Sequence, residues 1–270
     1  MKKIVLVICI LSTFLFGKSL DEIRSGGVIR VGVADNWKPF SVKDGNSGEF
    51  KGFDIELSKK IATKIFGNLD GKVMFIDLDA DDRIPALEDD VVDIIAWGFV
   101  STPEREKLVD FSLPYVSFHL AALTKTGSEI ARLDDLRKSK VAVVSWSFAE
   151  SEMERMGIDT LSYPEEDYAY EAVKSGEVDA YVDDNLRLMS YSAVDGGVEV
   201  AIKKIDQSVF YSLGTKKGNK ELLDEINKAL IGLSKEGFFK KAYDEIFAPF
   251  YKDTVDKNQF LLDEFYSIIG

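Results

Sequence analysis

The chain has 270 residues, and its 47 acidic side chains outnumber its 34 lysines and arginines, which gives a formal net charge of −13 at pH 7. A surface of this charge repels phosphate backbones and anionic lipid headgroups, so we expect no nucleic-acid partner. With one histidine and one cysteine, the chain also lacks the side chains for a zinc site or a histidine-based catalytic triad, and we expect no metal and no cofactor.

Residues 1–19 are predicted to be a secretory signal peptide. Two lysines precede an apolar run, Ile4 to Phe16, that is too short to anchor the chain in a bilayer, and small residues offer a cleavage site after Ser19. The only cysteine, Cys9, lies inside this segment, so the exported chain has no thiol to form a disulfide. Without the three lysines at positions 2, 3 and 18, it keeps 31 basic residues against 47 acidic ones, a net charge near −16. We expect a periplasmic protein.

Strands and helices alternate through the first half of the exported chain. Short apolar runs are typical of buried strands, and apolar residues three and four apart are typical of helices. Because strand and helix alternate, we expect a mostly parallel sheet with helices on both faces, which binds ligands beyond the carboxyl ends of its strands. The predicted strands are Val28–Val33, Val73–Leu78 and Val91–Trp97, and the predicted helices are Phe53–Phe66 and Ile84–Glu88.

A second unit of the same kind follows Lys125, without a linker rich in proline or glycine. It is predicted to contain the strands Val141–Val144 and Val178–Val182 and the helices Asp134–Arg137, Ser147–Met156, Glu171–Ser175 and Leu186–Ser192.

The chain is predicted to cross between two lobes twice, near Tyr115–Lys125 and near Ser208–Gly214, and to end in helices around Leu222–Leu233 and Phe238–Phe247. We therefore assign residues 20–120 and 209–270 to lobe 1 and residues 121–208 to lobe 2. Two crossing segments form a hinge, which suits closure around a ligand. The last residues, from Phe250 on, are predicted to be either a helix held against lobe 1 or a frayed tail.

The segment VVDIIAWGFVSTPEREKLVDFSLPY, from Val91 to Tyr115, is the most informative part of the chain. After the apolar strand, Gly98 permits a sharp turn, Thr102 suits a helix N-cap and Pro103 suits the first helical position. A cation in the first turn of a helix is disfavoured by the helix dipole, so Arg105 indicates an anion pocket. The alternative is that Arg105 lies on a solvated face and pairs with an adjacent glutamate.

The motifs PFSV, GFDIEL, VDII, STPER and VDFSLPY occur in this order. Together they resemble the family 3 periplasmic solute-binding proteins, the polar amino-acid receptors of ABC transporters, over about Val28 to Phe247. The resemblance implies a two-lobed α/β fold of the type II periplasmic-binding-protein class, with two hinge strands. It also implies a monomer that binds an amino acid or a related amine, docks on a membrane permease and catalyses no reaction.

The resemblance also implies the site. The ligand's carboxylate would be held by Arg105 and by the loop that contains Gly98 and Val100, although Val100 stands where the family commonly has a hydroxyl residue. Asp184 matches the family's carboxylate for the ligand's ammonium group, whereas Asp183 beside it has a solvated loop as its simpler interpretation.

Aromatic residues are the other predicted components of the site. Trp146, Ser147 and Phe148 occupy the second lobe's turn, where the two aromatics are as well explained by packing, and Trp37 and Trp97 match positions in the cleft. One hypothesis is that the three tryptophans form an aromatic cage around a cationic ligand, such as a lysine- or arginine-like amino acid or a quaternary amine. The alternative is an unspecified polar amino acid.

Two other functions fit the same scaffold. Some relatives of the fold are dehydratases that act on prephenate-like or arogenate-like acids, and Asp184 would then be a general acid. A ligand-sensing protein for a quaternary amine is the other alternative, and it would have to signal through a separate receptor. Nothing in the sequence demands either function.

Overall fold

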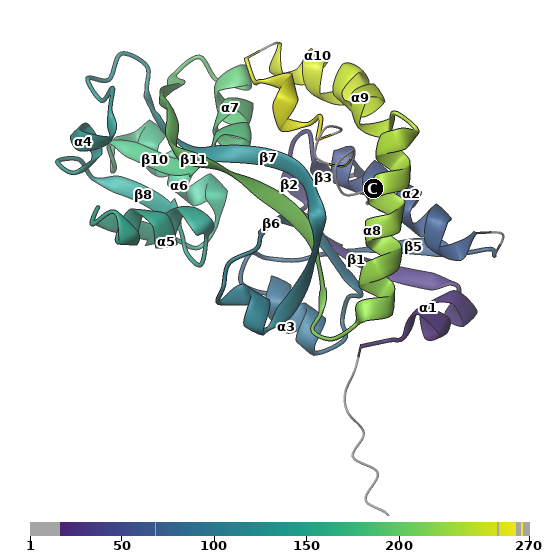
Figure 1. Ribbon diagram of the computed structural model, residues 1–270. Coiled ribbons are helices and arrows are strands. Elements are labelled where there is room, and N and C mark those ends of the chain that lie inside the picture. The colour runs from purple at the N-terminus through teal and green to yellow at the C-terminus, as the bar shows by residue number, and fades with distance from the viewer. Residues whose placement is uncertain (1–16, 68, 253, 263–265, 267–270) are drawn as a thin grey trace, which may run out of the picture.

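The computed structural model describes residues 17–67, 69–252, 254–262 and 266 (Figure 1). Nearly all of the predicted leader lies outside these residues. Within them, no helix has the length and apolar character needed to span a membrane. Ser19 is the N-cap of α1 (Leu20–Gly26): its hydroxyl accepts a hydrogen bond from the Glu22 N–H at 3.2 Å, and its own N–H donates to the Glu22 carboxylate at 2.8 Å.

One sheet runs through the molecule, formed by β1 (Val28–Val33), β5 (Lys72–Asp77), β6 (Ile94–Val100), β7 (Val109–Lys125), β8 (Val141–Val144), β9 (Thr160–Tyr163), β10 (Ala180–Asp184) and β11 (Val198–Lys216). Its strand order is β5-β1-β6-β11-β7-β10-β8-β9. The three strands on each side of the central pair are parallel to one another, whereas β7 and β11 pair antiparallel along most of their length. The predicted mostly parallel sheet is confirmed, with an antiparallel pair at its centre.

The two central strands are longer than the predicted crossing segments. Each passes through both groups of secondary structure, so β7 and β11 belong to both halves of the molecule (Figure 1). Their pairing is interrupted by register shifts, several of which lie between Val200 and Val209. Such irregularities bend a strand pair, so the connection between the halves is not a flat ribbon.

Helices cover both faces of each half. One group consists of α1, α2 (Phe53–Phe66), α3 (Arg83–Glu88) and α8 (Lys220–Lys235), and the other of α4 (Leu133–Leu136), α5 (Phe148–Arg155), α6 (Glu166–Ser175) and α7 (Asn185–Val194) (Figure 1). The predicted helix over 53–66 is confirmed to the residue. It buries the side chains that recur at helical spacing, including Ile55, Ile61 and Ile65.

Gly52 fixes the start of α2 beside a small sheet of β2 (Asn36–Trp37), β3 (Ser41–Lys43) and β4 (Phe50–Lys51). Its φ is 128°, and a Cβ there would lie 2.3 Å from the Phe40 carbonyl oxygen, so only glycine fits. The first N–H groups of α2, those of Phe53 and Asp54, donate to the carbonyls of Pro39 and Phe40. This arrangement holds the loop that carries Trp37 against the core.

The end of the chain packs against both halves. After α9 (Phe238–Ala242) and the π-helical turn η2 (Tyr243–Phe247), we call residues 248–262 the C-terminal strap; it contains α10 (Ala248–Tyr251) and η3 (Lys257–Gln259). The Tyr251 hydroxyl donates to the Leu186 carbonyl at 3.0 Å, and the Gln259 amide donates to the Ser117 carbonyl at 3.2 Å. Gln259 also exchanges two hydrogen bonds with the Asn185 amide, at 3.1 and 3.2 Å. The described part of this segment is therefore neither a single helix nor a frayed tail.

Two predictions around the arginine motif are wrong. The strand predicted to end at Trp97 continues as β6 to Val100, so Gly98 lies inside it, with a φ of 44°. The predicted helix is only a 3-10 turn, η1 (Arg105–Lys107), because β7 begins at Val109. Thr102 still acts as a local cap, since its hydroxyl accepts from the Arg105 N–H at 3.3 Å.

Candidate functional site

A small cavity of about 50 Å³ lies between the two halves, where β6, β8 and β10 end. Its volume is enough for only a few water molecules. Residues from both halves line it, and they include Asp183 and eight of the nine predicted site residues: Trp37, Trp97, Gly98, Val100, Arg105, Ser147, Phe148 and Asp184. Trp146 is the predicted residue that does not line it.

Arg105 spans the cavity from the turn after β6. Its guanidinium donates to the Val100 carbonyl at 3.1 Å and, across the cleft, to the Trp146 carbonyl at 2.8 Å. The alternative pairing with an adjacent glutamate is not observed, because no carboxylate among the described residues lies within 4 Å of it. Burial lowers the pKa of this guanidinium, which marks a cation held partly away from water. Carbonyl oxygens alone leave its positive charge without a counterion.

The acidic side of the cavity is at the start of α7. Asp184 is buried and caps that helix, accepting from the Arg187 N–H at 2.7 Å. Asp183 accepts from the Asp184 N–H at 2.8 Å and from the Tyr181 hydroxyl. Burial, together with the neighbouring charge of Asp184, raises the pKa of Asp183 to about 7. Burial also raises the pKa of Asp184, although the cation of Arg187 opposes this shift.

Arg187 and Glu166 complete the charges on this side, and the sequence reasoning missed both. The Arg187 guanidinium lies 3.2 Å from a Glu166 carboxylate oxygen and 3.9 Å from Asp184. It also stacks over Trp37, 4.6 Å from the ring centroid. The charges of the second half are thus largely paired with one another.

Arg83, on α3, is a further residue that the sequence reasoning missed. It is only 8 % exposed, and its guanidinium lies over Trp97 and Phe99, 5.0 and 5.3 Å from the ring centroids. Its Nε donates to the Ala80 carbonyl at 2.7 Å. Burial lowers the pKa of Arg83 to about 9, and the positive charges of Arg105 and Arg187 lower it too, while the charge of Glu166 opposes the shift. One signal was available: Arg83 shares a helix face with Ala86 and Leu87, where a core residue is expected.

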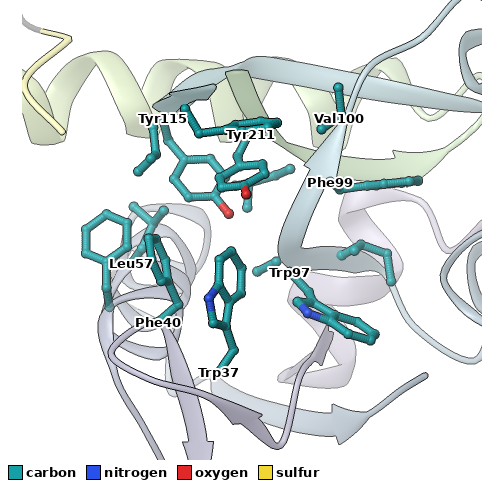
Figure 2. Close-up of a cluster of buried hydrophobic side chains, with 14 of the residues drawn as sticks. Trp37, Phe40, Leu57, Trp97, Phe99, Val100, Tyr115 and Tyr211 are labelled. Carbon is teal, nitrogen blue, oxygen red and sulfur yellow. The ribbon is translucent and has the colours of Figure 1, made fainter. Parts of the chain in front are cut away.

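The hypothesis of a tryptophan cage is wrong. Trp37 stacks on Phe40 at 4.2 Å and meets the edge of Tyr211 at 5.6 Å, as Figure 2 shows, and its other contact is the guanidinium of Arg187. The guanidinium of Arg83 lies over the Trp97 ring, and the Trp146 side chain is 73 % exposed. The rings do not surround a common space, because guanidinium groups of the protein itself cover two of them and the third faces solvent.

The turn of the second half is built around a helix cap. The Ser147 hydroxyl accepts from the Glu150 N–H at 3.0 Å at the start of α5, so this oxygen is engaged within its own turn. Trp146 just before it has a positive φ of 61°, which directs its carbonyl toward Arg105. Phe148 packs edge-on against Phe118 at 6.1 Å, so this aromatic combines packing with lining the cavity.

No group of three or more histidine, cysteine or carboxylate side chains is arranged to hold a metal ion within the part of the chain that the structure describes.

Two α/β halves joined by two shared strands, with charged side chains meeting between them, define the class of two-lobed binding proteins with the type II periplasmic-binding-protein fold. Residues 29–249 match the bacterial extracellular solute-binding proteins, family 3, and the chain belongs to that family. The predicted family, fold class and solute-binding function are therefore confirmed.

Three relatives illustrate the match. The chain is 32 % identical over 238 residues to the ABC transporter glutamine-binding protein GlnH of Bacillus subtilis (strain 168), covering 87 % of this chain and 85 % of that protein. The solute receptor for L-cysteine of Neisseria gonorrhoeae superposes with a TM-score of 0.83 at 28 % identity, covering 90 % of this chain and 98 % of the receptor. The cysteine-binding protein from Campylobacter jejuni gives a TM-score of 0.82 at 32 % identity, covering 89 % and 97 %.

Proposed function

We propose that this protein captures an amino acid outside the cytoplasm and delivers it to the membrane permease of an ABC importer. The observation that carries the proposal is the opposition of charges across one cavity, with the guanidinium of Arg105 on one side and the carboxyls of Asp183 and Asp184 on the other. The relatives named as glutamine- and cysteine-binding proteins support an amino acid as the class of ligand.

In this mechanism the ligand's α-carboxylate binds Arg105, and its ammonium group binds the Asp183–Asp184 pair. The carboxylate gives Arg105 the counterion that the carbonyls of Val100 and Trp146 do not supply. Because the anion site is on one half and the acids are on the other, a bound amino acid stabilises the closed arrangement by its differential affinity for it.

The hinge is proposed to consist of the shared strands β7 and β11. Lobe 1 would then comprise residues 20–120 and 209–270, and lobe 2 residues 121–208, with the irregular pairing between Val200 and Val209 next to the second boundary. The cavity of about 50 Å³ is smaller than an amino acid, so the lobes have to separate or cleft side chains have to move for the ligand to enter.

The remaining parts of the proposal follow from this role. The leader directs the chain to the periplasm, where it works as a monomer and presents its closed form to the permease. Gripping a ligand between opposite charges requires no covalent step, so we propose no catalytic activity.

A thermal-shift screen of the purified protein tests the proposal, because a ligand that binds only the folded state raises the melting temperature. We expect at least one amino acid to raise Tm by several degrees and Arg105→Ala to abolish that shift. Arg132→Ala is the matched control, because the Arg132 side chain is 78 % exposed and pairs with Asp135 on its own turn. The proposal fails if no amino acid raises Tm, or if Arg105→Ala responds as the wild type does.

A further inference from the structure

The cleft contains more guanidinium groups without an ion-pair partner than one α-carboxylate can pair with. Three guanidinium groups line the small cavity, those of Arg83, Arg105 and Arg187. Of these three, Arg187 alone has carboxylates within 4 Å among the residues that the structure describes, those of Glu166 and Asp184. Arg83 and Arg105 have hydrogen-bond partners that are all backbone carbonyl oxygens in the described part of the chain. Neither of these two cations therefore has a carboxylate within 4 Å among the described residues.

Of these two cations, Arg83 has the weaker set of partners for its charge. Its Nε donates to Ala80 at 2.7 Å, but its other contact, from Nη1 to the Trp97 carbonyl, is long at 3.4 Å. The rings of Trp97 and Phe99 offer it attraction without neutralising its charge. A buried charge without a partner is costly, and the cost is recovered only when an anion arrives. Arg83 is thus a buried cation whose charge a bound anion would balance.

The two unpaired guanidinium groups lie close enough to hold one small molecule. Their central carbons are 5.3 and 5.4 Å from the centroid of the same Phe99 ring, so they are at most about 11 Å apart. Both groups also line the larger hollow of about 1,210 Å³ that opens to solvent next to the small cavity. Arg83 and Arg105 therefore line the same two spaces, where one ligand can contact both.

We infer that the ligand is an amino acid with a second carboxylate, carried by its side chain and held by Arg83. This inference rests on the proposed function and names the class of substrate. Arg105 takes the α-carboxylate, the Asp183–Asp184 pair takes the ammonium group, and Arg83 takes the side-chain carboxylate. A cationic ligand is disfavoured, because the protein's own guanidinium groups already cover the faces of Trp37 and Trp97.

Isothermal titration calorimetry on the purified protein, unfolded and refolded to release any retained solute, tests the inference directly. The probes are L-glutamate and L-aspartate, their amides L-glutamine and L-asparagine, and L-cysteine and L-arginine. We expect at least one of the acids to bind at least about 30-fold more tightly than its own amide, as the loss of a buried charge partner requires. If an amide, L-cysteine or L-arginine binds as tightly as the acids, the inference is wrong while the proposed function stands.

The variant Arg83→Gln tests the assigned role of the side chain. It should weaken binding of the acid at least about 30-fold and leave binding of the amide within about threefold, because only the acid uses the charge. Arg132→Gln is the control and should change neither affinity. The melting temperature of ligand-free Arg83→Gln should equal or exceed that of the wild type, since an unpaired buried cation has been removed. If the folded variant loses acid and amide equally, Arg83 is a structural residue and the inference falls.

Discussion

The two sides of the cleft treat their charges in opposite ways. On the second lobe, Arg187 is paired with Glu166 and Asp184, and Asp184 also caps α7. On the first lobe, Arg83 and Arg105 contact only carbonyl oxygens and aromatic rings among the described residues. The charged groups on the second lobe pair with one another without a ligand. Those on the first lobe gain an ion-pair partner only when an anion binds. The comparison suggests that stability and ligand affinity depend on different arginines of the same cavity.

The largest expected effect separates these two kinds of arginine. Arg187→Met leaves the buried carboxyl of Asp184 and the partly buried carboxylate of Glu166 without their cation, and we expect it to lower the free energy of unfolding by about 3–5 kcal/mol. Chemical denaturation of the ligand-free protein measures this. Arg155→Met is the matched control, because Arg155 is 59 % exposed and solvent screening leaves its ion pairs with little effect on stability. Equal effects of the two variants would contradict the comparison.

A substitution at Gly98 tests the shape of the first side rather than its charge. The residue has a positive φ, and a Cβ there would lie 2.9 Å from the Trp37 ring, which is held by Phe40 and Arg187. Gly98→Ala should cost about 1–3 kcal/mol of stability, because the ring or the strand has to shift. Denaturation curves measure the loss. A variant as stable as the wild type would show that Trp37 can move freely.

The pH dependence tests the acidic side. Burial raises the pKa of Asp183 to about 7, so between about pH 4 and pH 7 the folded protein binds this proton more tightly than the unfolded chain does. The ligand-free protein should therefore lose stability as the pH rises through this window. Ligand affinity should instead increase, by up to about tenfold from pH 6 to pH 8, because the ammonium group needs the ionised carboxylate.

Asp183→Asn should remove both trends, since the amide does not titrate over this range. Calorimetric titrations and denaturation curves at matched ionic strength measure them. If the variant retains the wild-type slopes, another group is responsible.

The smallest expected effect concerns Ser147. Its hydroxyl is engaged in capping α5, so Ser147→Ala should cost about 1 kcal/mol of stability and leave ligand affinity within about threefold. Thermal unfolding and calorimetry on the same preparation measure both quantities. A large loss of affinity at unchanged stability would mean that the hydroxyl contacts the ligand instead.

The sequence predicts the fold well where periodicity alone decides the structure. The strands at 28–33 and 141–144 and the helix at 53–66 were predicted with the observed bounds, because most of their buried residues are apolar and follow the period of the element. The shared strands were predicted too short, since β11 carries exposed polar residues and register shifts through its middle that mask a two-residue period. The helix predicted around Arg105 does not form, because the next strand begins four residues later.

The site could be predicted only in part. Residues on the motif and at the strand ends were identified, and most of them line one cavity. Arg83 and Arg187 were missed because a helical arginine does not by itself indicate a binding site, and their roles depend on contacts with Trp97 and Trp37 that only the fold creates. The tryptophans misled the interpretation for the same reason, because a sequence does not show which ring face is already occupied.

The C-terminal strap has a consequence for how the cleft works. Gln259 grips the side chain of Asn185, the residue directly after Asp184, and at the same time donates to the backbone of β7 at Ser117. Asn185 also accepts a hydrogen bond from the His119 N–H of β7, and β10 pairs with β7, so the strap adds to a connection that the sheet already makes between the acids and the central strand. A motion that separates Asn185 from Ser117 therefore has to break the hydrogen bonds of Gln259 or carry the C-terminal strap along with it.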